Sequence, residues 1–156
     1  MNLQTKVNID TPDFMIDYNS KLMMLGSCFV ENMGGKFSYY KFGVDVNPCG
    51  IVYNPRSVAN VLRLIVEGKE FKQEDLIQVG DKWVSLYHHG SFSSTDAGEC
   101  LDKINRRLER ATVEIRSADL LVITWGTAWV YRHTGKGVVV SNCHKIPSQE
   151  FERYRL

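Results

Sequence analysis

Apolar positions along this chain gather in two short uninterrupted runs that are followed by polar or turn-forming residues. The first covers residues 22–25 and ends at Gly26, and the second lies within residues 119–124, where Asp119 and Thr124 flank four apolar residues. Continuous apolar runs of this length are typical of strands buried on both faces, as in a parallel sheet. We therefore expect two such strands, with a further short strand over residues 43–46.

Helical periodicity fills the segments between these strands. Residues 29–37 directly follow the first strand and can wind as a helix. A second helix is expected to begin at Asn54-Pro55 and to stop near Gly68, because asparagine caps helices, proline suits the first turn and glycine suits the end. A third follows the capping residues 93–96, and its apolar stripe recurs at helical spacing: Leu101, Ile104, Leu108, Ala111 and Ile115.

The rest of the pattern adds smaller elements. Loose alternation predicts a strand over residues 83–87, and residues 129–132 and 138–140 are typical of a hairpin around a glycine-containing turn. The alternating order of strands and helices favours a three-layer α/β domain. Residues 150–156 read like the start of a further helix, so we expect residues 1–156 to be one domain that is the N-terminal part of a longer one.

Composition narrows the function classes. The 156 residues carry a formal net charge of +1, which offers no electrostatic case for nucleic acid or an anionic membrane as a partner. No apolar run is as long as a membrane span, and the N-terminus lacks the apolar core of a secretory signal. We expect a cytoplasmic protein.

Metal ions and cofactors are not expected. The four cysteines are scattered and form no Cys-x-x-Cys pair. A site could be imagined from His88, His89, Cys143 and His144, but this spacing matches no standard zinc pattern.

The residues after Gly26 are the first candidates for chemistry. Ser27 and Cys28 stand where a buried strand turns into a helix, and ligands of open α/β sheets bind at the carboxyl ends of the strands. A helix N-terminus presents free N–H groups to developing negative charge and favours the reactive thiolate form of a cysteine. The alternative is that Cys28 is merely a small buried residue.

A nucleophile also needs a base and donors for the oxyanion. The candidate bases are His88, His89, His133 and His144, and the His88-His89 pair lies in a polar loop after a strand. Gly50 and Gly126 allow backbone N–H groups to approach a ligand closely, although each glycine could simply permit a tight turn.

Five short motifs, in this order, resemble those of the GSCFA-domain family, and they are distributed along nearly the whole chain. They are Gly26-Ser27-Cys28-Phe29-Val30, Asn47-Pro48-Cys49-Gly50-Ile51 with Asn54-Pro55, His88-His89-Gly90-Ser91-Phe92, Gly126-Thr127-Ala128-Trp129-Val130-Tyr131-Arg132 and Asn142-Cys143-His144-Lys145-Ile146-Pro147. That family is similar to the SGNH, or GDSL-like, hydrolases. The resemblance implies a flavodoxin-like α/β/α fold with a mainly parallel sheet.

The resemblance also implies roles for individual residues. Cys28 matches the nucleophile, with Ser27 as second choice, and Gly50 matches the oxyanion glycine. Gly126-Thr127-Ala128 stands where those enzymes carry Gly-x-Asn, so the asparagine donor is replaced by Ala128 and Thr127 is its candidate substitute. The Asp-x-x-His motif that these enzymes carry near their C-terminus does not occur after Pro147.

These features predict a hydrolase or acyltransferase that forms an acyl-enzyme with an acyl ester, for which a carbohydrate ester is a candidate. His89 is the local candidate for a base or for substrate positioning. The rival interpretation is a non-catalytic sugar- or ligand-binding module on the same fold, because fold does not determine function. A phosphate-binding nucleotide domain is disfavoured, since the turn lacks a Gly-x-x-x-x-Gly-Lys loop. An incomplete sheet would leave an open edge, so we expect self-association.

Overall fold

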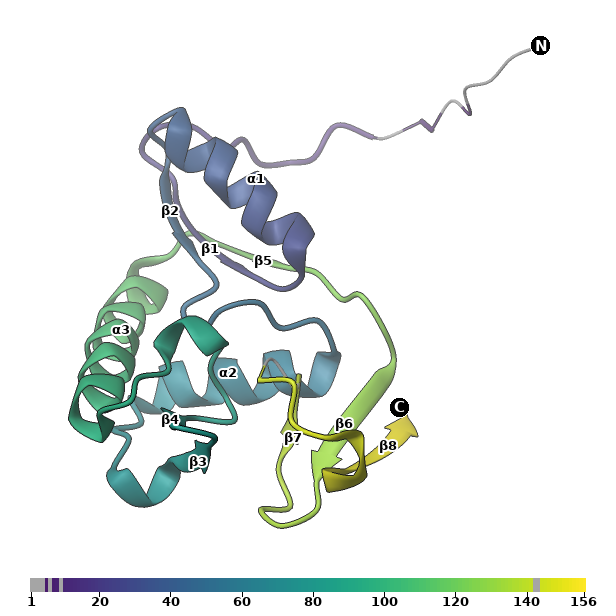
Figure 1. Ribbon diagram of the computed structural model, residues 1–156. Helices are drawn as coiled ribbons and strands as arrows, with labels where there is room; N and C mark the ends of the chain where they lie inside the picture. The colour runs from purple at the N-terminus through teal and green to yellow at the C-terminus, as the bar shows by residue number, and fades with distance from the viewer. Residues whose placement is uncertain (1–4, 6, 9, 142–143) are drawn as a thin grey trace.

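The protein is a mixed α/β structure. The computed structural model describes residues 5, 7–8, 10–141 and 144–156 (Figure 1). The helices are α1 (Cys28–Tyr39), α2 (Pro55–Glu67) and α3 (Ala97–Ser117). The strands are β1 (Lys21–Leu25), β2 (Gly43–Val46), β3 (Ile77–Val79), β4 (Lys82–Val84), β5 (Leu120–Ile123), β6 (Trp129–His133), β7 (Val139–Val140) and β8 (Phe151–Arg155).

A three-stranded parallel sheet in the order β2-β1-β5 organises the site. Met24 pairs with Val46 on one side and with Val122 on the other, so the carboxyl ends of the three strands lie at one edge. Residues 22–25 are all buried, as the first apolar run predicts. The expected parallel strands at 22–25, 43–46 and 119–124 are therefore confirmed.

Helices cover both faces of this sheet. On one face, Met23 and Leu25 join the main core together with residues of α2 and α3. Arg107 of α3 forms an ion pair with the buried Asp45 of β2 on this side. On the opposite face, α1 lies against the sheet, and Gly34 leaves room for Val46. The sheet is thus held between α1 and the helices of the core.

The predicted helix boundaries are confirmed by their caps. The Asn54 side chain accepts a hydrogen bond from the Ser57 N–H at 2.8 Å, and α2 ends at Gly68 in the left-handed conformation. The Asp96 carboxylate caps α3 by accepting from the Glu99 N–H at 2.8 Å. The apolar stripe of α3 faces the core, most deeply at residues 104, 108 and 111.

Two expectations were wrong. The strand at 119–124 is not buried on both faces: among the described residues β5 pairs with β1 alone, and Leu121 is 42% exposed at this edge. Residues 150–156 do not begin a helix, because Phe151–Arg155 forms β8, which pairs antiparallel with β6. Arg153 lies 4.1 Å above the Trp129 ring, a cross-strand contact that stabilises the extended conformation.

The smaller antiparallel elements agree with the pattern in part. The predicted hairpin is formed by β6 and β7. The strand expected at 83–87 is shorter, since β4 covers Lys82–Val84 and the chain then turns, with the His88 N–H donating to the Ser85 carbonyl at 3.2 Å. In the part of the chain that the structure describes, no helix combines the length and the apolar character needed to cross a membrane.

Candidate functional site

The Gly26–Cys28 turn joins β1 to α1, as the sequence predicts. Ser27 is the N-cap of α1, and its hydroxyl oxygen accepts a hydrogen bond from the Phe29 N–H at 3.3 Å. Cys28 is the first residue of the helix and is exposed. Among the described residues, no hydrogen-bond acceptor is assigned to the Cys28 N–H, as is common for N–H groups in the first turn of a helix.

Gly26 is required by close packing at this turn. Its φ is +149°, and a Cβ atom there would lie 2.3 Å from the Thr124 Oγ1 and 2.6 Å from the Thr124 carbonyl oxygen. Thr124 follows β5, and its Oγ1 also accepts from the Ser27 N–H at 3.3 Å. The ends of β1 and β5 are therefore in direct contact through this pair.

Asn47 connects the turn to β2, and the sequence placed it only within one of the five motifs. Its side-chain oxygen accepts from the Gly26 N–H at 2.9 Å, and its side-chain nitrogen donates to Glu31 Oε2 at 2.8 Å. Its φ of +41° is one that asparagine tolerates better than most residues. An asparagine directly after a strand and before Pro-Cys-Gly was the available signal, but its partners are distant in sequence.

The Gly50 motif packs beside the Gly26 turn. The Gly50 N–H donates to the Asn47 carbonyl at 2.7 Å, and the Val52 N–H donates to the Gly26 carbonyl at 3.1 Å. Gly50 has a φ of +85°, and a Cβ atom there would lie 2.2 Å from the Cβ of His89. His89 is thus the candidate base that contacts this part of the site, and its N–H donates to the Cys49 carbonyl at 2.8 Å.

The Gly126-Thr127 segment after β5 is also held by hydrogen bonds to other parts of the protein. The N–H groups of Gly126 and Thr127 donate to the Tyr53 carbonyl at 2.8 Å and 3.3 Å. The Thr127 hydroxyl oxygen accepts from the Trp129 N–H at 3.1 Å. The backbone amides of Gly50, Gly126 and Thr127 already have protein acceptors, so only their rearrangement would free them for an oxyanion. Their predicted roles stay predictions.

His88 is a packing residue rather than an exposed base. It is buried between the rings of Phe71 and Phe92, and its Nδ1 lies 2.8 Å from the Ser85 Oγ. Burial, with a smaller contribution from nearby His144, lowers the pKa of His88 to about 3. His88 is therefore neutral at physiological pH.

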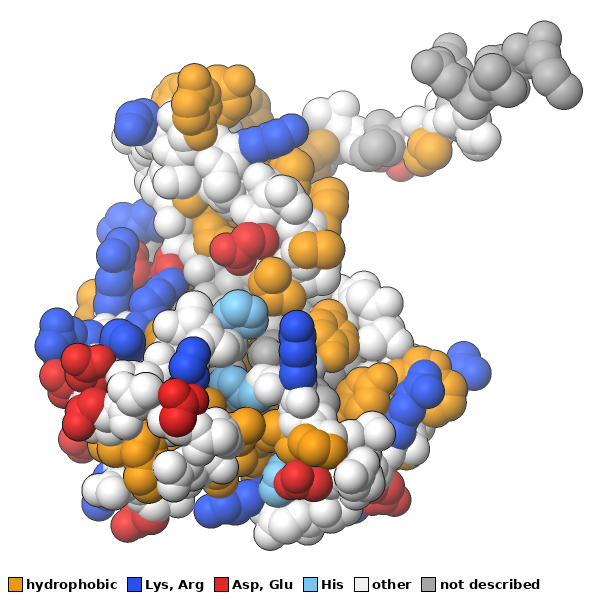
Figure 2. Space-filling model, in the orientation of Figure 1, with side chains coloured by type: hydrophobic (Ala, Val, Ile, Leu, Met, Phe, Trp, Pro, Cys, Tyr) orange, Lys and Arg blue, Asp and Glu red, His pale blue; other side chains and the backbone are white. Residues whose placement is uncertain are grey.

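The other two candidate bases have partners of their own. The His144 Nε2 lies 2.8 Å from the Ser85 carbonyl oxygen, and burial lowers the pKa of His144. His133 is buried against Phe151, and its Nε2 is 3.5 Å from a Glu150 carboxylate oxygen. Histidine side chains reach the surface of the half of the molecule that lies below α1 in Figure 2.

The described cysteines fall into two classes. Cys49 and Cys100 are buried, and burial raises the pKa of the Cys49 thiol to about 12, whereas Cys28 is exposed. Within residues 10–141 and 144–156, no three His, Cys, Asp or Glu side chains are grouped as a metal site would require. Cys143 of the imagined metal set, and Asn142 beside it, lie outside the described residues.

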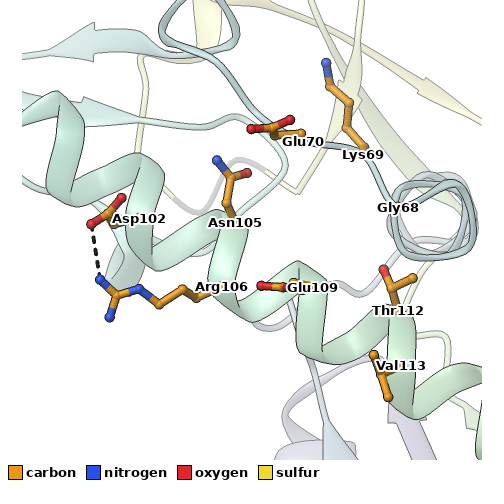
Figure 3. Close-up of a pocket in the computed structure, with 9 residues that line it drawn as sticks. All are labelled: Gly68, Lys69, Glu70, Asp102, Asn105, Arg106, Glu109, Thr112 and Val113. Carbon is orange, nitrogen blue, oxygen red and sulfur yellow. Dashed lines mark hydrogen bonds and ion pairs between the residues drawn. The ribbon is translucent and has the colours of Figure 1, made fainter.

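A groove of about 480 Å³ runs along α3 beside the end of α2, away from all five motifs in sequence (Figure 3). Its polar lining is largely satisfied within the protein. The Asn105 side-chain oxygen accepts a hydrogen bond from the Phe71 N–H, and the Asn105 side-chain nitrogen donates to the Phe71 carbonyl. The Thr112 hydroxyl donates to the Ile65 carbonyl at 2.8 Å. The Asn105 and Thr112 side chains in the groove therefore serve to hold α3 against neighbouring segments.

Replacing Asn47 with alanine is expected to destabilise the protein by about 2 kcal/mol, because the buried Gly26 N–H loses its acceptor. Urea denaturation measures this change. Asn32→Ala is the matched control, since the Asn32 side chain donates to the Cys28 carbonyl from an exposed position and its loss should change little. Equal effects of the two substitutions would contradict the role assigned to Asn47.

Segments that follow β1, β2 and β5, which are distant in sequence, thus meet at the carboxyl edge of the parallel sheet. Searches find no match among curated proteins and none among solved structures. The model of the GSCFA family matches residues 21–156, which include all five motifs. The chain therefore belongs to the GSCFA family.

Proposed function

We propose that this protein is a hydrolase or acyltransferase of the SGNH type, with a flavodoxin-like arrangement, that acts on an acyl ester through an acyl-enzyme on Cys28. The observation that carries the proposal is the position of Cys28. It is an exposed thiol on the first residue of a helix, directly after a buried strand and a tight glycine turn. A thiol in this position is open to an approaching substrate carbonyl.

The proposed reaction has two halves. The Cys28 Sγ attacks the ester carbonyl carbon, the oxyanion forms, and its collapse breaks the bond to the alcohol oxygen, which leaves with a proton. Water, or an acceptor alcohol in a transferase, then attacks the thioester carbonyl carbon; the carbon–sulfur bond breaks, the acyl group leaves as a carboxylic acid or a new ester, and the proton given up by the attacking oxygen restores the Cys28 thiol. The Cys28 N–H and the first turn of α1 supply positive partial charge for the oxyanion. His89 is the candidate for moving the proton, and an ester on a carbohydrate is the candidate substrate.

Ser27 is the weaker choice of nucleophile because its hydroxyl has another task. Its oxygen caps α1 by accepting from the Phe29 N–H and lies 3.4 Å from the Thr124 Oγ1. A serine nucleophile would have to give up this cap.

A non-catalytic binding module is the second candidate function. The engaged amides of Gly50, Gly126 and Thr127 favour it, together with Ala128 in the place of an asparagine donor. Such a module would hold a sugar or an acylated ligand at the same sheet edge without attacking it.

Exposure to p-nitrophenyl acetate, followed by intact-mass spectrometry and peptide mapping, tests the proposal. We expect one acetyl group on Cys28 in the wild type and in Cys49→Ala, and none on that peptide in Cys28→Ala. Cys49 is the matched control because it is a buried thiol whose pKa is raised. An adduct lost only in Ser27→Ala would make Ser27 the nucleophile. No adduct on a folded protein would favour the binding module.

A further inference from the structure

Three buried polar side-chain atoms share one property: none has a hydrogen-bond partner among the described residues. They are Ser57 Oγ, His88 Nε2 and Ser141 Oγ. The three residues are 4%, 2% and 6% exposed, respectively. Ser57 lies in the first turn of α2, His88 in the turn after β4, and Ser141 directly after β7. Leaving such groups unpaired costs free energy, so each is normally bonded to protein or to ordered water.

The same three residues line one small cavity. Its volume of about 10 Å³ is close to that of a single water-sized sphere, and much of its remaining wall is apolar, including Val52, Val61 and Val140. A larger ligand does not fit a space of this size. The three polar residues give one water molecule the number of partners that buried waters usually have.

Hydrogen bonds beside the cavity fix the positions of the segments that line it. The Tyr53 hydroxyl donates to the Ser141 carbonyl at 2.6 Å, and the Asn60 side chain donates to the Val139 carbonyl at 3.0 Å. The His88 Nδ1 is fixed 2.8 Å from the Ser85 Oγ, which leaves only Nε2 for the cavity. The polar atoms are thus held on the wall of a preformed space.

We propose that Ser57, His88 and Ser141 form a binding site for one ordered water molecule that bridges α2, the turn after β4 and the segment after β7. Each of these elements would then depend on the other two. Because His89 follows His88 and packs on Gly50, the water also stabilises the placement of the candidate base. The inference rests on these contacts and does not require the proposed hydrolase activity.

A double-mutant cycle of Ser57→Ala and Ser141→Ala, read by urea denaturation, tests the water site. Each substitution is expected to lower the folding equilibrium constant roughly tenfold, because the water loses a partner. The double variant should lose less than the product of the single effects, since both serines bind the same water. Ser38→Ala on the exposed side of α1 is the matched control and should be neutral or slightly stabilising.

If the cavity holds no water and the two serine hydroxyls are unpaired, the opposite result is expected. Replacing each with alanine would then raise the folding equilibrium constant, and the two effects would multiply, which would overturn the proposal. A crystal structure at high resolution gives an independent readout that does not depend on stability. Density for one water within hydrogen-bond distance of all three atoms is expected. Serine hydroxyls bonded to protein groups, with no density between them, would contradict the site.

Discussion

Gly26→Ala is expected to destabilise the protein by about 4 kcal/mol, since it combines two unfavourable effects. The φ of +149° is poorly accessible to alanine, and the added Cβ would meet the Thr124 Oγ1 at 2.3 Å and the Thr124 carbonyl oxygen at 2.6 Å. The carbonyl is backbone and cannot rotate away as a flexible side chain would. Relief would require β1 and β5 to separate at the edge that carries Cys28.

Gly35→Ala is the matched control for this prediction. Gly35 lies within α1, and apart from its chain neighbours and the helix's own backbone, no atom of the described residues lies within 4 Å of the position that a Cβ would take there. Alanine is favoured over glycine inside a helix by about 1 kcal/mol, so this variant should be more stable than the wild type. Urea denaturation of both variants gives the comparison. A Gly26→Ala protein as stable as the wild type would show that the turn is not closely packed.

The sequence predicts the parallel strands and the helix boundaries because these depend on local chemistry. The apolar run at 22–25, the Asn54-Pro55 cap and the αL conformation at Gly68 each follow from a few adjacent residues. The family motifs indicate which loops form the candidate site, although only the three-dimensional structure gives the contacts between these loops.

Long-range partners account for what the sequence did not predict. Residues 151–155 alternate in a way that is compatible with the start of a helix, yet pairing with β6 makes them a strand. The edge position of β5 depends on which strands pair with it, not on its own apolar residues. Asn47 bonds residues 21 and 16 positions before it, so the local pattern could indicate that Asn47 matters but not which residues it contacts.

The histidines show the same limit for the candidate site. His88 and His89 are adjacent in sequence, but one is buried between two aromatic rings and the other packs on Gly50. Their shared motif could not separate a packing residue from a candidate base. The Phe71 and Phe92 rings around His88, and the contact between His89 and Gly50, make that separation.

Acid is expected to destabilise the protein strongly through His88. Its pKa is about 3 in the folded state, mainly because of burial, against 6.5 for an ordinary histidine. Unfolding therefore takes up a proton between these pH values, and the stabilisation present above pH 6.5 is lost as the pH falls toward 3. The slope from this residue approaches 1.4 kcal/mol per pH unit, for a loss on the order of 5 kcal/mol across the window. His144, whose pKa is also lowered, acts in the same direction.

His88→Gln isolates this contribution, because glutamine is polar and does not titrate. Unfolding free energies from urea denaturation at several pH values between 7 and 4 should fall steeply for the wild type and less steeply for the variant. The comparison uses the slopes, so a variant that is less stable at every pH still gives an answer. Identical slopes would mean that His88 takes up no additional proton on unfolding and would contradict the lowered pKa assigned to it.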